Sequence, residues 1–184
     1  MIPLGRIASD FKLINVSIDE FMTLKEIQSD IGTVIMFIRN HCLYVEHILE
    51  KLFDLARHYI PKGISFVAIN SNDPKMYPED THEEMKKLSK KLDFPFPYLS
   101  DVTQEIAWSY GAACTPDFFV FNKGLECVYR GQFDDSRPGN NRPITGKNLG
   151  EALDCLLSNK EVPFEQKPSV GCRIKWSESH SLCI

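Results

Sequence analysis

Cys42 is the residue best suited to covalent chemistry among the six cysteines of the chain. It follows an apolar, β-branched run and precedes a helical pattern of apolar residues, so we expect it at a helix N-terminus. Unpaired backbone N–H groups and the helix dipole favour an anion there, and Arg39 and His41 lie close by in the sequence. These three influences predict a nucleophilic thiolate of low pKa. The alternative is a small buried apolar residue in the first turn of the helix.

A second cysteine lies in Cys114-Thr115-Pro116, just before a strand-like run. An X-Pro bond in such a place is one of the few that can be cis. A cis bond would turn the backbone sharply and leave polar edge groups available to pair with an extended partner chain.

The other cysteines fall into different surroundings. Cys127 lies in a strand-like run and Cys155 on a helix face, which favours ordinary packing roles for both. Cys172 follows Gly171 in a segment that we expect to pack onto the domain. Cys183 is one residue from the terminus and is expected to be mobile.

No metal or cofactor is expected from the pattern of ligand-type residues. The five histidines show no zinc-type spacing with cysteine. Asp134 and Asp135 are adjacent carboxylates in the polar loop 133–141, where turn formation is more typical than metal binding.

The composition is typical of one soluble globular domain. The chain has 184 residues, 43% hydrophobic and 25% charged, so it can fold without disulfide staples, and its dispersed cysteines indicate a reducing compartment. A net charge of −4 without a basic stripe makes nucleic acid an unexpected partner. Since no signal peptide or membrane-length apolar run is visible, we expect a cytoplasmic location and no membrane partner. The oligomeric state is not predicted.

Two continuous apolar runs, residues 33–38 and 64–69, predict strands that are covered on both faces. Residues 45–59 between them have helical spacing, which makes a βαβ unit. A helix is also expected near residues 81–92, where Thr81 and Glu84 have the spacing of a capping box.

The remaining elements are shorter. Hairpins are expected within residues 11–24 and 117–130, a short strand at 98–100, and helices at 103–110 and 145–157. This order predicts an α/β domain over residues 1–159, with a mixed central sheet and helices on both faces, and a tail over residues 160–184 that packs on it. Cys42 then lies beyond the carboxyl end of a central strand, where reactive groups are expected.

Five segments of the chain together carry a resemblance to a known family: residues 37–45, 67–73, 111–119, 129–138 and 166–176. They resemble a bacterial branch of the thioredoxin-like redoxins in the alkyl hydroperoxide reductase and thiol-specific antioxidant (AhpC/TSA) superfamily. The resemblance implies a thioredoxin fold with an N-terminal β extension. It also implies that Pro116 is the cis-proline of that fold, which places Cys114 and Thr115 beside the start of the first long helix.

The chain departs from this family at its Cys-Asn-His-Cys motif. Cys42 resembles the second cysteine of the motif, but Arg39 stands in place of the first, and Leu43 stands where relatives have proline. An arginine cannot form a mixed disulfide, so an ordinary Cys-x-x-Cys cycle is excluded. The peroxiredoxin pattern of Pro and Thr before the cysteine is also absent.

Two hypotheses of different class remain. In the first, Cys42 is a single thiolate activated by Arg39, and it attacks a peroxide or a protein or small-molecule disulfide. Cys114 or Cys172 would then be the resolving thiol, and a cellular thiol would be the reductant.

The resemblance would place Thr115, Pro116 and His41 at the substrate. In the second hypothesis, the chain is a catalytically degenerate module that binds an extended peptide or partner without redox turnover. Survival of the three cysteines in their motifs favours the first hypothesis.

Overall fold

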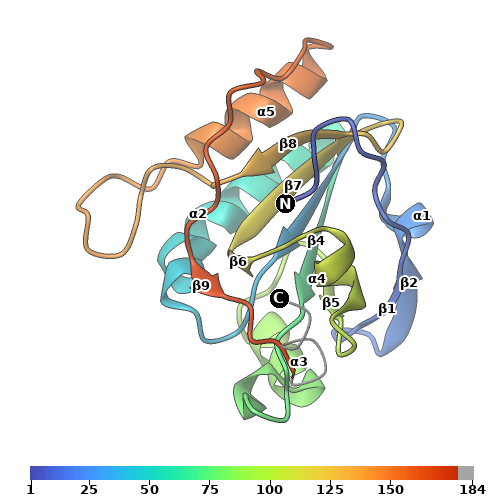
Figure 1. Ribbon diagram of the computed structural model, residues 1–184, viewed down its shortest axis with the longest axis vertical. Coiled ribbons are helices and arrows are strands. Elements are labelled where there is room, and N and C mark those ends of the chain that lie inside the picture. Colours follow the sequence, from blue (N-terminus) through green and yellow to red (C-terminus); the bar gives the residue numbers. More distant parts are fainter. Residues whose placement is uncertain (178–184) are drawn as a thin grey trace.

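A mixed seven-stranded sheet forms the centre of the computed structural model, which describes residues 1–177 (Figure 1). The strand order is β2-β1-β5-β4-β3-β7-β8. The strands are β1 (Lys12–Asn15), β2 (Glu20–Thr23), β3 (Gly32–Phe37), β4 (Ile64–Asn70), β5 (Tyr98–Ser100), β7 (Asp117–Asn122) and β8 (Cys127–Gly131). β3 pairs in parallel with β4 and antiparallel with β7. The predicted mixed sheet and both hairpins are therefore confirmed.

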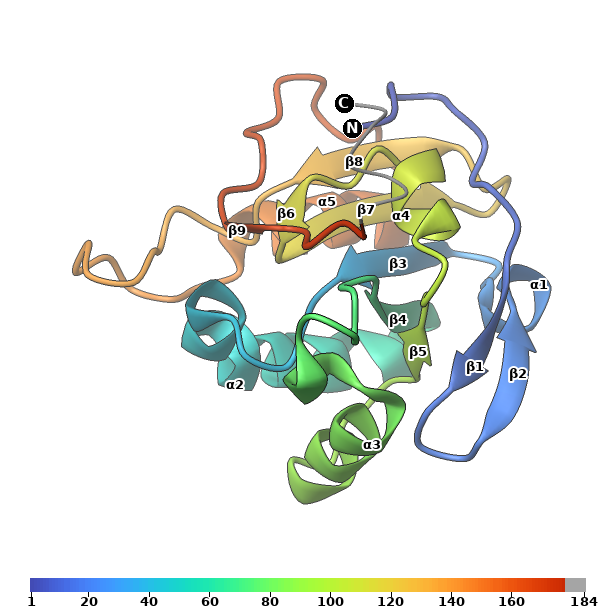
Figure 2. The ribbon, with the colours of Figure 1, turned by 60° about the horizontal axis from the view of Figure 1, so that its bottom comes forward.

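Helices cover both faces of the sheet, as expected (Figure 2). The helices are α1 (Leu24–Ile27), α2 (Leu43–Tyr59), α3 (His82–Lys91), α4 (Glu105–Ser109) and α5 (Lys147–Leu157), with short 3₁₀ turns η1 (Ile60–Lys62) and η2 (Pro78–Asp80). α2, α3 and α5 contribute to one apolar cluster, and α1 and α4 to the other. This arrangement is the thioredoxin fold that the sequence suggests.

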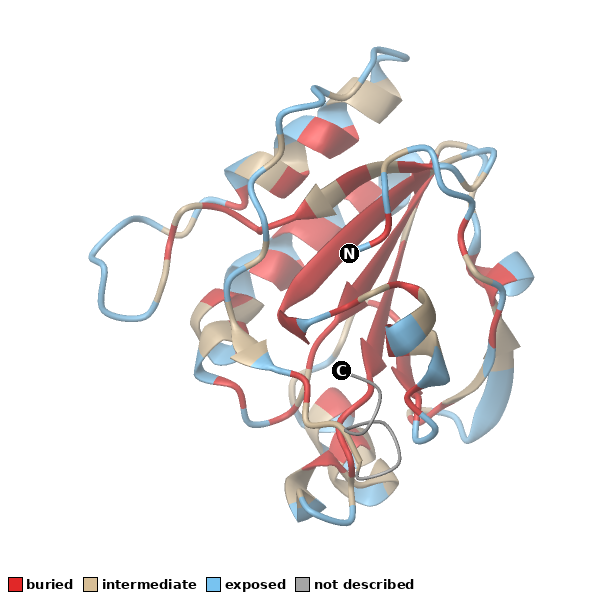
Figure 3. Cartoon of the chain, in the orientation of Figure 1, coloured by how far each residue is buried: buried red, intermediate tan, exposed pale blue. Residues whose placement is uncertain are grey.

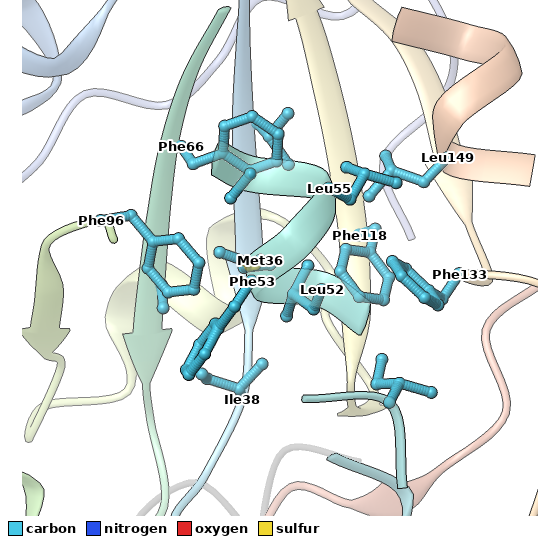
Figure 4. Packing of buried hydrophobic residues seen from close by; sticks show 14 of the residues in the cluster. Met36, Ile38, Leu52, Phe53, Leu55, Phe66, Phe96, Phe118, Phe133 and Leu149 are labelled. Atoms are coloured by element: carbon cyan, nitrogen blue, oxygen red, sulfur yellow. The ribbon is translucent and has the colours of Figure 1, made fainter. Parts of the chain in front are cut away.

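The central strand β3 explains why the two clusters form. Its side chains point alternately to opposite faces, so Val34 and Met36 enter the cluster beneath α2, and Ile35 and Phe37 enter the other. All four side chains are buried, as is most of the neighbouring strand surface (Figure 3). Figure 4 shows the α2 side, where Leu52 and other residues of α2 lie against the sheet.

The predicted capping box at the start of α3 is wrong. Thr81 is the residue before α3, but its side chain makes no capping bond, because its hydroxyl donates to the Pro78 carbonyl at 2.9 Å. Glu84 pairs with Lys87 instead. The capping box of the structure is at α1, a helix missed in the sequence, where Thr23 and Glu26 bond reciprocally.

The tail crosses the domain after α5 and forms a second, two-stranded sheet. Its strand β9 (Cys172–Arg173) pairs antiparallel with β6 (Cys114–Thr115), just before β7. Ile174 is buried in the cluster on the α4 side of the main sheet. Within the expected tail, residues 172–174 therefore lie against the domain, whereas Cys183 lies outside the described residues. Residues 1–177 contain no helix that is both long and apolar enough to cross a membrane.

Candidate active site at the start of α2

The loop between β3 and α2 positions Arg39 and Cys42 through a buried polar network. The Asn40 N–H donates to Asp80 Oδ1 at 3.0 Å, and the Asn40 side chain donates to the Glu79 carbonyl at 2.6 Å. The Tyr98 hydroxyl donates to Asn40 Oδ1 at 3.1 Å. Because these groups are buried, their hydrogen bonds fix the loop against η2 and β5.

Cys42 is the residue directly before α2, in the N-cap position, and it is 0% exposed. Its thiol donates to the Thr115 carbonyl at 3.2 Å, and the Thr115 hydroxyl donates back to the sulfur at 3.4 Å. Burial opposes ionisation, but the Thr115 hydroxyl, the N–H of Val45 and the Cys172 thiol outweigh it, so the pKa of Cys42 lies below its ordinary value. The helix N-terminus and the loop before Pro116 thus meet at one sulfur.

Arg39 lies beside this sulfur and is half-buried. Burial opposes its charge, but the adjacent Cys42 thiolate and the Asp80 carboxylate raise the pKa of Arg39 above its ordinary value. The guanidinium lies over the Tyr77 ring, 6.0 Å from the centroid. Arg39 Nε and Asp80 Oδ2 are both buried without a hydrogen-bond partner among the described residues.

Cys172 reaches the same place from the tail. It pairs with Thr115 across the two-stranded sheet, and Thr115 is the residue that bonds to the sulfur of Cys42, so the Cys172 thiol lies near enough to Cys42 for the two groups to shift each other's pKa. Burial and the nearby Cys42 raise the pKa of Cys172, and the neighbouring Arg39 guanidinium opposes the change. Cys172 is partly exposed, whereas Cys42 is completely buried. The structure therefore brings Arg39, Cys42, Thr115 and Cys172 together.

Cys114 is the third cysteine near the site, and its surroundings differ. The Thr115–Pro116 bond is cis, as the resemblance implies. The Cys114 thiol donates to the Pro116 carbonyl at 3.8 Å. Burial, followed by the charge of Asp117, raises the pKa of Cys114 to about 12. Cys114 is thus a protonated thiol at neutral pH, and its pKa is shifted in the opposite direction from that of Cys42.

His41 is the remaining predicted site residue, and its side chain is exposed. The main interactions of Cys42 are with Thr115, α2 backbone groups and Cys172 rather than with His41. Within residues 1–177, no group of three or more His, Cys, Asp or Glu residues is placed to hold a metal ion. The Asp134 carboxylate accepts backbone N–H groups from Ser136, Thr145 and Gly146, which agrees with a turn-forming role.

Several residues that hold the tail at this site escape sequence reasoning. Asn72 Oδ1 accepts the Lys175 N–H at 2.8 Å, and Gln104 Nε2 donates to the Lys175 carbonyl at 2.8 Å. On the other side of β9, the Ser169 hydroxyl donates to Asp117 Oδ1 at 2.6 Å. These contacts join distant parts of the chain, so the only local signal is Gly171 next to Cys172.

The model of the AhpC/TSA family matches residues 4–129 of this chain. The chain belongs to the AhpC/TSA family. The match includes the β3–α2 loop, Cys114, Thr115 and Pro116, but it ends before Cys172. A comparison with curated proteins gave no match.

Solved structures extend the likeness over the tail. An uncharacterized conserved protein from Geobacillus kaustophilus is 56% identical, with a TM-score of 0.95 over 97% of this chain and 94% of that chain. A hypothetical protein from Sinorhizobium meliloti is 43% identical, with a TM-score of 0.93 over 97% of both chains. The peroxidoxin BcpB from Mycobacterium tuberculosis is 18% identical, with a TM-score of 0.62 over 86% of this chain and 98% of that chain, and it supports the thioredoxin fold alone.

Proposed function

We propose that this AhpC/TSA protein is a thiol oxidoreductase whose redox-active pair is Cys42 and Cys172. The observation that supports the proposal is the placement of both cysteines at Thr115, which bonds to the sulfur of Cys42 and pairs with Cys172 across the two-stranded sheet. Cys172 supplies, from the tail, the second sulfur that Arg39 does not supply from the motif. Cys114 is a weaker candidate for the resolving thiol because it is buried and its thiol donates to the Pro116 carbonyl, whereas Cys172 is partly exposed and pairs with Thr115.

With a peroxide as the oxidant, the Cys42 thiolate attacks one peroxide oxygen. The O–O bond breaks, the other oxygen leaves and is protonated to an alcohol or water, and Cys42 becomes a sulfenic acid. Cys172 then attacks the sulfenic sulfur, and water leaves as the disulfide forms. Two thiols thereby supply the two electrons that reduce the peroxide.

With a disulfide as the oxidant, the same pair reacts through a mixed disulfide and releases two thiols. A thiol reductant restores the pair in either case. Arg39 favours the anionic form of both sulfurs, because the guanidinium charge lies beside Cys42 and Cys172. In this proposal Thr115 positions the sulfur of Cys42 through its hydroxyl and carbonyl.

Oxidation by hydrogen peroxide followed by peptide mass mapping tests the proposal. The parent chain should form a Cys42–Cys172 disulfide, and so should Cys114→Ser, the matched control. Cys172→Ser should lose the disulfide and accumulate further oxidised Cys42. A Cys42–Cys114 disulfide would contradict the choice of partner, and unreactive Cys42 would support the binding-module hypothesis instead.

A further inference from the structure

Strand β6 presents the kind of backbone edge that can bind an extended chain. Such an edge offers N–H and C=O groups that a partner segment can pair with, as in strand addition. Here the edge lies directly before Pro116 and beside Cys42, so a protein disulfide would approach the redox pair along it. Within residues 1–177, however, β6 already pairs with the chain's own β9.

The contact between the two strands leaves no room for another chain. The register places Cys172 opposite Thr115 and Arg173 opposite Cys114, and the Ile174 N–H donates to the Ala113 carbonyl at 3.1 Å. A Cβ atom on Gly171 would overlap the Thr115 carbonyl oxygen. At Gly171 the two backbones therefore approach so closely that a methyl group cannot enter between them.

Anchors on both sides of β9 hold this strand in place. Before β9, the Ser169 hydroxyl donates to Asp117 and to the Gly131 carbonyl, both at 2.6 Å. After β9, the Lys175 backbone bonds to Asn72 and Gln104. A competing segment would have to break these bonds and also remove Ile174 from the apolar cluster.

We infer that β9 closes the edge of β6 to extended protein segments, so that the pair of Cys42 and Cys172 reacts with small-molecule oxidants and not with protein disulfides. The inference rests on the proposed function. A small peroxide needs no strand pairing to reach the sulfurs, and neither does a low-molecular-weight disulfide. With such a disulfide, the two thiols supply two electrons and two protons, their own disulfide forms, and two small thiols leave.

Reaction rates with oxidants of graded size test this inference in the full-length protein. The reduced chain is mixed with hydrogen peroxide, glutathione disulfide or insulin, and formation of the Cys42–Cys172 disulfide is followed by acid quench and mass spectrometry. We expect insulin to react at least about tenfold more slowly than the faster of the two small oxidants. A smaller ratio overturns the inference.

A variant with a loosened tail tests whether β9 is the cause of this selectivity. The double substitution Asn72→Ala with Gln104→Ala removes the side chains that hold Lys175. It should lower the ratio of the faster small-oxidant rate to the insulin rate by at least about threefold. Asn148→Ala, which removes a polar side chain that bonds to Gln132, is the matched control and should leave the ratio unchanged.

An unchanged ratio in the double variant overturns the role of β9. If that variant forms no Cys42–Cys172 disulfide with hydrogen peroxide, Ser169→Ala, which frees the other end of the strand, replaces it and is judged by the same ratio. Absence of the disulfide in the parent chain refutes the proposed function itself. Rapid oxidation of the parent by insulin refutes only the inference about its substrates.

Discussion

Replacing Gly171 by alanine should separate Cys172 from Cys42 while leaving every sulfur in the chain. The new Cβ would lie 2.7 Å from the Thr115 carbonyl carbon and 3.2 Å from the Pro116 nitrogen. Since carbon atoms in contact are ordinarily about 3.5–4.0 Å apart, β9 must retreat by roughly 1 Å. The substitution therefore acts on the distance between the strands and not on the chemistry of the thiols.

The expected effect on disulfide formation is large. A misplacement of about 1 Å can slow a positioned reaction by about 10²-fold. Overpacking of this kind should also lower the free energy of unfolding by about 1–3 kcal/mol. We therefore expect Gly171→Ala to form the Cys42–Cys172 disulfide about 10²-fold more slowly than the parent after addition of hydrogen peroxide.

Gly150→Ala is the matched control for this experiment. Its Cβ would meet the Tyr59 hydroxyl at 3.6 Å and Leu55 Cδ1 at 3.9 Å, which are ordinary contacts, and alanine in a helix is favoured by roughly 0.5–1 kcal/mol. The rates are measured by acid quench and mass spectrometry, and urea unfolding gives the stability of each variant. If Gly171→Ala forms the disulfide at the parent rate, the close contact of β9 with Thr115 has no part in placing Cys172.

Three further predictions concern charge, pH and helix capping. Arg39→Ala should raise the pKa of Cys42 and slow the oxidation of Cys42 at pH 7 by up to about tenfold, whereas Arg39→Lys should keep most of the rate. Equal pH–rate profiles for the parent and both variants would contradict a role of the Arg39 charge in activating Cys42. Burial raises the pKa of Asp117 from 3.8 to about 6, so the folded protein binds a proton at this carboxyl more tightly than the unfolded chain does. The free energy of unfolding should therefore be highest at low pH and should fall by up to about 3 kcal/mol through this group as the pH rises from 4 to 6. Urea unfolding across this range should show a weaker fall in Asp117→Asn, and an identical fall in both proteins would exclude Asp117 as its source. Thr23→Ala should lower the free energy of unfolding by about 1 kcal/mol, and Thr81→Ala by less; the reverse order would contradict the capping assignment.

Much of the fold is predictable because short segments of the sequence indicate their own secondary structure and burial. The run at residues 33–38 is apolar at every position after Thr33, which is typical of a strand covered on both faces. The position of β5 between β1 and β4 has no such local signal, because it depends on pairing between distant segments. The capping-box prediction failed at Thr81 because a 3₁₀ turn directly before α3 offers its hydroxyl the Pro78 carbonyl instead.

The candidate site also has parts that the sequence predicts and parts that it does not. The place of Cys42 follows from the junction of a buried strand with a helix, and the cis bond at Pro116 follows from the family resemblance. The sequence left Cys114 and Cys172 as alternative partners of Cys42, and the pairing of Cys172 with Thr115 could not be predicted, because residue spacing along the chain does not report which segments meet. The sequence shows Gly171 beside Cys172, but the need for a glycine there comes from the close approach of the Thr115 carbonyl, which only the folded chain contains.

The arginine at position 39 is consistent with the proposed redox pair, in which Cys172 of the tail supplies the second sulfur. In a Cys-x-x-Cys motif the two sulfurs are held together by one helix turn, whether or not the rest of the chain is in place. The proposed pair of Cys42 and Cys172 requires β9 to lie on β6, since no local segment joins the two residues. A guanidinium beside both sulfurs then favours their thiolates without competing for either as a disulfide partner, which a third cysteine at this position would do.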